Sequence, residues 1–215
     1  MLKKLTVNNY FLLIILSAIW GSAFFAIKIG LESFSPITVA SLRLSIASLF
    51  LLFFFYIQKK KILFTGQIIY LLIIIGIIGN FIPFFLISWA EQHIPSSTAG
   101  MLMAIGPIIT LVMSHFLTKS DKFTIIKFVS ISIGFIGVLF IFSTNSFGNL
   151  VEYNFIDLIA KFLVIIAAFG YMLSNIIAYE KLNQLDSFSI TTFATTFGAI
   201  FSIPFFLIDI SFNNY

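Results

Sequence analysis

Ala18-Ile-Trp-Gly-Ser-Ala-Phe-Phe-Ala-Ile-Lys28 lies within an apolar run that extends over residues 10–31. A run of about 20 apolar residues is long enough to cross the hydrocarbon core of a bilayer as a helix. A lysine inside such a helix is costly, roughly 2.5–3.5 kcal/mol at the membrane centre and less near an interface. A second cation, Arg43, stands inside the next apolar run. The stretch therefore predicts a membrane helix, and its two cations become candidate functional groups.

The composition of the whole chain indicates that lipid is its solvent. Hydrophobic residues make up 60% of the sequence and charged residues 9%, against about 45–50% and about 25% in soluble domains. Runs of membrane-spanning length occur at 10–31, 36–57, 67–89, 96–117, 123–142, 157–179 and 188–208. The connections between them are short, so neighbouring helices run antiparallel. The predicted fold class is an all-α polytopic membrane protein with about seven transmembrane helices.

Several function classes are disfavoured by what the sequence lacks. The chain has no cysteine, which rules out a disulfide framework and a thiolate metal site. Most of its positive charge comes from lysines that lie in loops and do not form the basic face of a nucleic-acid-binding protein. No phosphate-binding loop, catalytic motif or metal-ligand spacing is found. We therefore expect no enzyme activity, no cofactor, no metal and no nucleic-acid partner, and the expected partners are membrane lipid and a small-molecule substrate.

The loop lysines predict how the chain lies in the membrane. With the N-terminus in the cytoplasm, the cytoplasmic segments contain Lys3, Lys4, Lys59, Lys60, Lys61, Lys119, Lys122, Lys127 and Lys181. The loops on the opposite side contain acidic residues and neither lysine nor arginine. Basic loops remain on the cytoplasmic side of membrane proteins. We expect a multi-pass protein of the cell (inner) membrane, with Asn213-Asn-Tyr215 on the outer side.

The two cations inside the apolar runs each have a structural and a functional interpretation. Lys28 lies about three residues, or about 5 Å, from the outer end of its helix. It either reaches the headgroups or faces a polar cavity. Arg43 lies about 10 Å deep. It either pairs with helix-terminal carbonyls, Glu32 or Glu91, or it serves as an anion-binding or gating group.

Glycine and proline predict bends in the middle of the third and fourth runs. Residues 76–83 contain two glycines, Asn80 and Pro83, and the centre of the fourth run is Gly106-Pro107. Proline removes one backbone hydrogen bond, and such breaks are tolerated where they are buried in protein or line a cavity. Two bends at the same depth fit a midplane binding site. Close helix packing through small residues is the alternative.

A weak internal repeat relates the two ends of the chain. A shift of 151 residues places Trp20 on Tyr171 and Pro36 on Ser187, so the last two runs fall on the first two. Five helices separate equivalent positions, and because that number is odd the second copy is inverted in the membrane. Many secondary transporters have this arrangement.

Several short motifs occur in a characteristic order. They are Ala18-Ile-Trp-Gly-Ser22 with Lys28, Ser35-Pro36, Leu42-Arg43 with Ala47, Ala90-Glu-Gln-His-Ile-Pro-Ser-Ser-Thr98 with Pro107, and Gly134 with Gly137. In order and spacing they resemble the EamA-type drug/metabolite transporter superfamily. The resemblance implies ten helices in two inverted five-helix repeats around a central cavity with alternating access. It divides this chain into a first repeat, 1–145, and two helices of a second repeat, 150–215.

The resemblance also implies a site and a function. The residues expected near the cavity are Trp20, Asn80, Gly106, Pro107, Tyr171 and Asn175. Arg43 and Lys28 would attract an anionic group such as a carboxylate. The leading hypothesis is a transporter, and more specifically an exporter, of small polar metabolites such as amino acids. The alternative is a truncated, transport-inactive fragment or a structural membrane protein of the same family, because helices eight to ten of the pattern are missing; a homo-oligomer is one way to close the open side.

Overall fold

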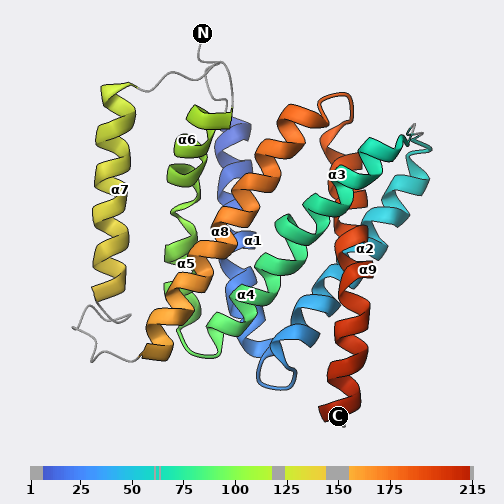
Figure 1. The fold of residues 1–215 in the computed structure, drawn as a ribbon, viewed down its shortest axis with the longest axis horizontal. Helices are drawn as coiled ribbons and strands as arrows, with labels where there is room; N and C mark the ends of the chain where they lie inside the picture. Colours follow the sequence, from blue (N-terminus) through green and yellow to red (C-terminus); the bar gives the residue numbers. More distant parts are fainter. Residues whose placement is uncertain (1–6, 61, 63, 118–123, 144–154, 214–215) are drawn as a thin grey trace.

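Helices form all the regular structure in the computed structural model, which describes residues 7–60, 62, 64–117, 124–143 and 155–213 (Figure 1). The elements are α1 Val7–Gly30, α2 Pro36–Ile57, α3 Gly66–Gly76, η1 Ile77–Phe81, α4 Ile82–Glu91, α5 Ser96–Met103, α6 Gly106–Leu117, α7 Ile125–Ser143, α8 Phe155–Lys181 and α9 Ser187–Asn213. Among these residues, six segments are long and apolar enough to cross a membrane, and a shorter apolar helix lies in α7. The prediction of an all-α polytopic membrane protein is confirmed.

The third predicted run is one membrane-length segment with a π-helical turn in its middle. Gly66–Glu91 continues through α3, η1 and α4, and η1 coincides with the loosened stretch that the glycines, Asn80 and Pro83 predict. Pro83 follows η1 in the first turn of α4, and because proline has no N–H to donate, it interrupts the regular hydrogen bonding of the segment there. Single π-helical turns interrupt the regular hydrogen bonding and are frequent at functional sites.

The fourth run breaks just before the position that the sequence suggests. α5 ends at Met103, Ala104 and Ile105 form a turn, and Gly106-Pro107 begins α6. Proline is well accommodated in the first turn of a helix, where the N–H it lacks has no helical partner. Gly106-Pro107 therefore starts a helix instead of bending one.

Three helices cross at glycines, which lets their backbones approach closely. A Cβ atom on Gly76 of α3 would lie 2.4 Å from the carbonyl oxygen of Ala194 in α9. A Cβ atom on Gly170 of α8 would lie 2.6 Å from the carbonyl oxygen of Ile78 in η1. Neither position has room for a larger residue. Small residues at such contacts are the usual means by which membrane helices pack, so the glycines serve packing as well as the break at η1.

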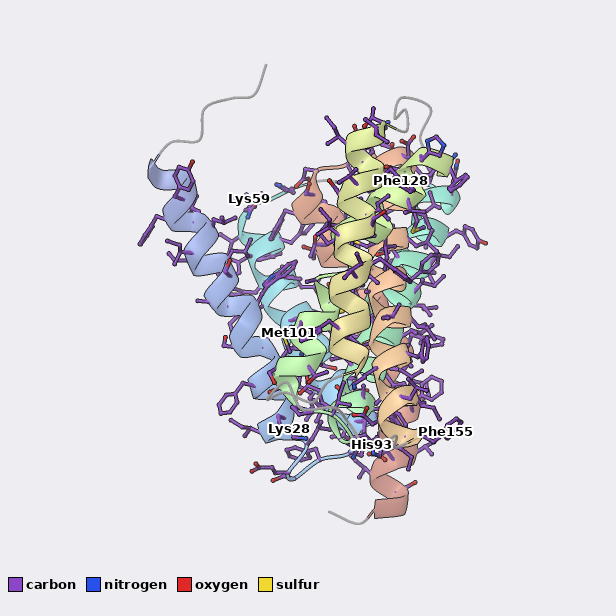
Figure 2. All side chains as sticks on the ribbon, turned by 90° about the vertical axis from the view of Figure 1, so that its left-hand side faces the viewer. Lys28, Lys59, His93, Met101, Phe128 and Phe155 are labelled. Atoms are coloured by element: carbon purple, nitrogen blue, oxygen red, sulfur yellow. The ribbon has the colours of Figure 1, made fainter. Side chains whose placement is uncertain are left out.

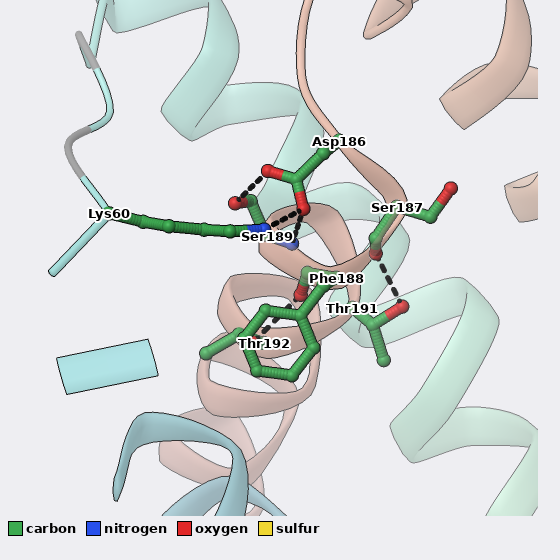
Figure 3. Close-up of polar contacts among 7 residues, drawn as sticks. All are labelled: Lys60, Asp186, Ser187, Phe188, Ser189, Thr191 and Thr192. Atoms are coloured by element: carbon green, nitrogen blue, oxygen red, sulfur yellow. Dashed lines mark hydrogen bonds and ion pairs between the residues drawn. The ribbon is translucent and has the colours of Figure 1, made fainter. Parts of the chain in front are cut away.

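α2 and α9 pack extensively along one side of the bundle, and polar side chains join them at both ends. Thr38 in the first turn of α2 donates a hydrogen bond of 2.7 Å to the Asp209 carboxylate near the end of α9. At the opposite end, Lys60 pairs with Asp186 at 2.6 Å, and Asp186 accepts hydrogen bonds from the backbone N–H and the hydroxyl of Ser189 in α9 (Figure 3). These polar contacts join α2 and α9 near both of their ends.

The bundle has two polar ends. Figure 2 shows Lys28, His93 and Phe155 at one end, and Lys59 and Phe128 toward the other. We call these the Lys28 end and the Lys59 end. The separation agrees with the antiparallel order that the short connections predict. Which end faces the cytoplasm stays a prediction from the loop lysines.

Candidate functional site

A cavity of about 460 Å³ lies between helices from both halves of the chain. It extends along most of the bundle, from Ile27 and Ile87 near the Lys28 end to Ala178 and Thr191 near the Lys59 end. Its walls are mostly apolar, with polar side chains from Arg43, Asn80, Tyr171, Ser174, Asn175 and Thr191. An apolar pocket with a few convergent polar groups is typical of a small-molecule site. Within the described chain no cluster of acidic or histidine side chains is arranged to hold a metal ion.

Arg43 is the one charged residue among the described residues that line the cavity. Its guanidinium carbon lies 4.3 Å from the centre of the Phe84 ring, where the π face attracts a cation. The Phe84 ring in turn lies 6.0 Å, centre to centre, from the Tyr171 ring of α8. The Nη1 atom of Arg43 is buried and has no hydrogen-bond partner within the described chain. The guanidinium is therefore positioned by aromatic rings and keeps a free donor.

Two amides add donors and acceptors to the wall, Asn80 from η1 and Asn175 from α8. η1 and α8 approach closely here, since a Cβ atom on Gly79 would lie 2.2 Å from the Ser174 hydroxyl. Ser174 donates that hydroxyl to the Tyr171 carbonyl oxygen at 2.8 Å, so its hydrogen is already engaged. An amide can accept from an ammonium group and donate to a carboxylate. The cavity thus offers groups for both ends of a zwitterion.

Trp20 forms part of the cavity wall on the α1 side, and it is 69% exposed. α1 packs on α5 and α4, while many of its other apolar side chains point away from the bundle. Phe24, one turn further along α1, also lines the cavity and packs against the core. The Trp20 ring therefore lies at the border between the cavity and the surface of the bundle.

Five of the predicted site residues meet at the cavity: Trp20, Arg43, Asn80, Tyr171 and Asn175. They belong to α1, α2, η1 and α8, which are far apart in the sequence. The cavity is therefore a product of the fold, and the residues that the resemblance selected are brought to one place.

Lys28, Gly106 and Pro107 are not among the residues that line the cavity, so their part in a substrate site stays a prediction. Lys28 instead donates a hydrogen bond to the backbone carbonyl oxygen of Glu91, at the end of α4. Gly106 is buried behind Met172 of α8, and Pro107 is exposed at the surface. Gly106-Pro107 begins α6 directly after the break at Ala104 and Ile105.

Sequence reasoning missed Phe84, Met172 and Thr191, all of which line the cavity. A partial signal existed for Phe84 alone. Phe84 follows Asn80 by four residues, which places both on one helix face. Met172 is adjacent to Tyr171 in α8, and because neighbouring residues of a helix point in different directions, this adjacency gave no signal. Thr191 is one of several threonines in α9, and its position gave no means of choosing it.

A group of three charged residues, which we call the buried cluster, lies at the Lys28 end of the cavity: Lys28, Arg43 and Glu91. Glu91 is fully buried, with 0% of its surface exposed. Neither of its carboxylate oxygens has a hydrogen-bond partner within the described chain. The positive charges of Lys28 and Arg43 both act on this carboxyl group. A buried charge is costly unless it is paired and hydrogen-bonded, and the Glu91 carboxylate in this cluster has no hydrogen bond from the described chain to offset its burial.

Comparison with known proteins gives the family. Residues 8–143 match the EamA-like transporter family. The chain is 24% identical to the uncharacterized transporter YoaV of Bacillus subtilis over 90% of its own length and 64% of that protein. It is 34% identical to the uncharacterized inner membrane transporter YedA of Escherichia coli over 61% of its length and 42% of that protein.

These relatives are longer than the chain. An uncharacterized transporter of Archaeoglobus fulgidus is 27% identical over 86% of the chain and 63% of that protein, so the chain spans less than two thirds of each of the three relatives. No solved structure matches the chain. The family match covers more than half of the sequence, and the chain belongs to the EamA-like transporter family of multi-pass membrane proteins.

Proposed function

We propose that the chain acts as a carrier of small polar metabolites that bear a carboxylate, amino acids among them, by alternating access. The observation that carries the proposal is the Arg43 guanidinium, which lies on the wall of a membrane-embedded cavity with a free buried donor. Hydrogen bonds between arginine and a carboxylate are charge-assisted and strong. Cations inside membrane bundles commonly mark substrate pathways. Membership of a transporter family supports the same function.

The rest of the cavity supports an amino acid as the substrate class. In this proposal Arg43 binds the carboxylate, and Asn80 and Asn175 accept hydrogen bonds from the ammonium group. The apolar wall, which includes Phe24 and Met103, contacts the side chain of the substrate. A few polar groups in an apolar pocket fix the orientation of a ligand while the wall supplies contact area.

The proposal places the protein in the inner membrane, with its N-terminus in the cytoplasm and the Lys59 end on the cytoplasmic side. The loop lysines support this orientation, and one relative is named an inner membrane transporter. The proposed direction is export, and the proposed organisation is a first repeat at 1–145 with two helices of an inverted second repeat at 150–215. A cavity lined by α1 and α2 together with α8 and α9 supports this organisation.

Counterflow with the purified chain in proteoliposomes tests the proposed function. Vesicles loaded with unlabelled L-phenylalanine, L-leucine, L-threonine or L-glutamate are diluted into trace amounts of the same labelled amino acid. We expect transient accumulation of at least one labelled amino acid. Arg43→Ala should reduce its initial rate by about tenfold or more, because a charge-assisted hydrogen bond is worth about 1.5–3 kcal/mol.

Lys181→Ala is the matched control, since Lys181 is an exposed cation at the end of α8. It should leave the rate unchanged. Counterflow that survives Arg43→Ala contradicts the role of Arg43. Absence of counterflow for all four amino acids, with folded protein in the vesicles, contradicts the proposed function and favours a transport-inactive member of the family.

A further inference from the structure

Glu91 is a buried carboxyl group that the proposed substrate site does not use. It is the last residue of α4, one turn beyond Ile87, which lines the cavity. Its side chain is fully buried, and both of its oxygens lack a hydrogen-bond partner in the described chain. A fully buried carboxylate without hydrogen bonds is unfavourable, whereas the neutral acid is tolerated. Burial without hydrogen bonds therefore opposes the ionised form of Glu91.

Arg43 connects Glu91 to the cavity. Its charge acts on the Glu91 carboxyl group, and its own Nη1 atom is buried and unpartnered. No hydrogen bond joins the two side chains in the structure, so the Glu91 oxygens can still accept hydrogen bonds and the Arg43 guanidinium can still donate one. When Glu91 is ionised, it compensates the charge of Arg43. When Glu91 is neutral, the guanidinium lacks a counter-ion and attracts an external anion more strongly.

The neighbouring helices supply few competing charges. The ionisable groups at this end of the elements packed against α4 are Lys28 of α1, Arg43 of α2, and Asp157, Lys161 and Tyr171 of α8. Asp157 and Lys161 form their own ion pair at 3.0 Å. η1 and α5 contain no ionisable side chain. His93, in the turn after α4, packs on Trp89 with ring centres 4.5 Å apart.

Lys28 holds the end of α4 without pairing with the Glu91 side chain. It donates its hydrogen bond to the Glu91 backbone carbonyl oxygen, not to the carboxylate. The positive charges that act on Glu91 within the described chain are those of Lys28 and Arg43. The ionised form of Glu91 is thus opposed by burial and supported by two cations, and the binding of an anion to Arg43 shifts that balance toward the neutral acid.

We propose that Glu91 is the proton-binding group that couples transport to the proton gradient, and that one proton travels with one anionic substrate group. The inference rests on the proposed function of the same cavity. In the step, an O–H bond forms on a Glu91 carboxylate oxygen with a proton from water on the side to which the site is open. The substrate carboxylate binds Arg43 in the same state. After reorientation the O–H bond breaks, the proton returns to water on the opposite side, and the substrate leaves.

Lys28 and Arg43 decide whether the proton and the substrate move in the same direction or in opposite directions. A cationic substrate would compete with the proton for Glu91 and be exchanged against it, whereas a carboxylate competes with Glu91 for Arg43 and moves with the proton. Net export then proceeds only when the combined gradient of substrate and protons is directed outward. A zwitterionic amino acid should respond to a pH gradient, and its decarboxylated amine should not be carried by the same step.

The test compares wild-type chain with Glu91→Gln in proteoliposomes, using labelled L-phenylalanine and labelled phenethylamine, its decarboxylated amine. Wild-type vesicles with an interior about one pH unit more alkaline should accumulate phenylalanine up to about tenfold. Glu91→Gln should lose this accumulation but keep phenylalanine counterflow at equal pH, because the amide resembles the neutral acid. Glu32→Gln is the matched control, since Glu32 is an exposed acid at the same end, and it should behave as wild type.

A second readout needs no transport. Infrared difference spectra of the substrate-free chain between about pH 5 and about pH 9 should contain a buried carboxyl band that titrates and that Glu91→Gln removes. Loss of wild-type counterflow would overturn the proposed function, while this band would still decide the protonation of Glu91. Proton-driven accumulation that persists in Glu91→Gln, accumulation of phenethylamine that depends on Glu91, or a carboxyl band unaffected by the variant would each overturn the inference.

Discussion

The two ends of the bundle carry charged groups in opposite environments. At the Lys59 end, Lys60 and Asp186 are 2.6 Å apart, and their side chains are 34% and 48% exposed. Asp186 also accepts two hydrogen bonds from Ser189 (Figure 3). At the Lys28 end, Glu91 is fully buried and no hydrogen bond reaches its carboxylate from the described chain. The Asp186 carboxylate is thus exposed to solvent and hydrogen-bonded, whereas the Glu91 carboxylate is buried and has no hydrogen-bond partner among the described residues.

This difference separates a structural role from a functional one. Exposed ion pairs contribute about 0–1 kcal/mol to stability, and they do so most effectively when hydrogen bonds fix their geometry, as at Asp186. A buried group that is left unsatisfied destabilises the fold, so Glu91 is a poor means of holding helices together. The Lys60–Asp186 pair therefore joins the ends of α2 and α9. In the buried cluster, by contrast, Glu91 has oxygens that are unpartnered within the described chain and can bind a proton, and Arg43 has an unpartnered donor that can bind an anion.

The largest expected loss of stability comes from reversing the charge of the acidic residue at each end of the bundle. Glu91→Lys would bury a third cation beside Lys28 and Arg43, and we expect it to destabilise the protein by about 3 kcal/mol or more. Asp186→Lys should cost about 1–2 kcal/mol, for the lost ion pair and the lost cap of α9. Thermal unfolding in detergent, followed by circular dichroism, measures both. Equal losses of stability in Glu91→Lys and Asp186→Lys would contradict the difference between the buried and the exposed acid.

A smaller loss of stability is expected at the crossing of α3 and α9, between the two ends of the bundle. Gly76→Ala would place a Cβ atom 2.4 Å from the Ala194 carbonyl oxygen, and such overpacking costs about 1–3 kcal/mol. Gly21→Ala is the matched control, because no atom outside its own helix lies within 4 Å of a Cβ there. That variant should be neutral or slightly stabilising, since alanine favours helices over glycine. If Gly76→Ala melts at the same temperature as Gly21→Ala, the close crossing of α3 and α9 is disproved.

The smallest expected effect is the loss of stability at acid pH that comes from the exposed Lys60–Asp186 pair. The hydrogen bond from Lys60, together with those from Ser189, lowers the pKa of Asp186 from 3.8 to about 2. Because the pKa is depressed in the folded state, the stability it contributes is present above about pH 4 and is lost as the pH falls toward about 2. Solvent screening limits the contribution to about 1 kcal/mol or less.

Asp186→Asn provides the test of that acid sensitivity. Above about pH 4 the variant should unfold at a lower temperature than wild type, and the two melting temperatures should converge as the pH approaches 2. A constant difference across this range would show that Asp186 acts through its hydrogen bonds with Ser189 and not through its charge.

The positions of the six membrane-length segments and the break at η1 could be predicted from the sequence. Apolar length decides where a chain crosses the bilayer, and the glycines with Pro83 mark where the third helix loosens. Helix boundaries at Pro36 and Gly66 also agree with the structure to within one residue. These features depend on local composition, which a sequence displays directly.

The rotation of each helix about its axis could not be predicted. In lipid both the buried and the exposed faces are apolar, so hydrophobic periodicity does not identify the inward face. Phe84, which lies against Arg43, and Phe53, which is 60% exposed, look equivalent in the sequence. For the same reason the sequence did not reveal that Lys28 turns to a carbonyl oxygen of α4 instead of the cavity.

The most direct test of the cavity uses the absence of cysteine from the natural chain. A single cysteine at Asn175 would lie on the cavity wall, whereas a cysteine at Ile46, which is 55% exposed on α2 close to Arg43, would lie outside the cavity. We predict that a membrane-impermeant thiol reagent labels Asn175→Cys in proteoliposomes, that a transported amino acid slows the labelling, and that Ile46→Cys stays unlabelled. An unreactive Asn175→Cys, or equal labelling at the two positions, would contradict it.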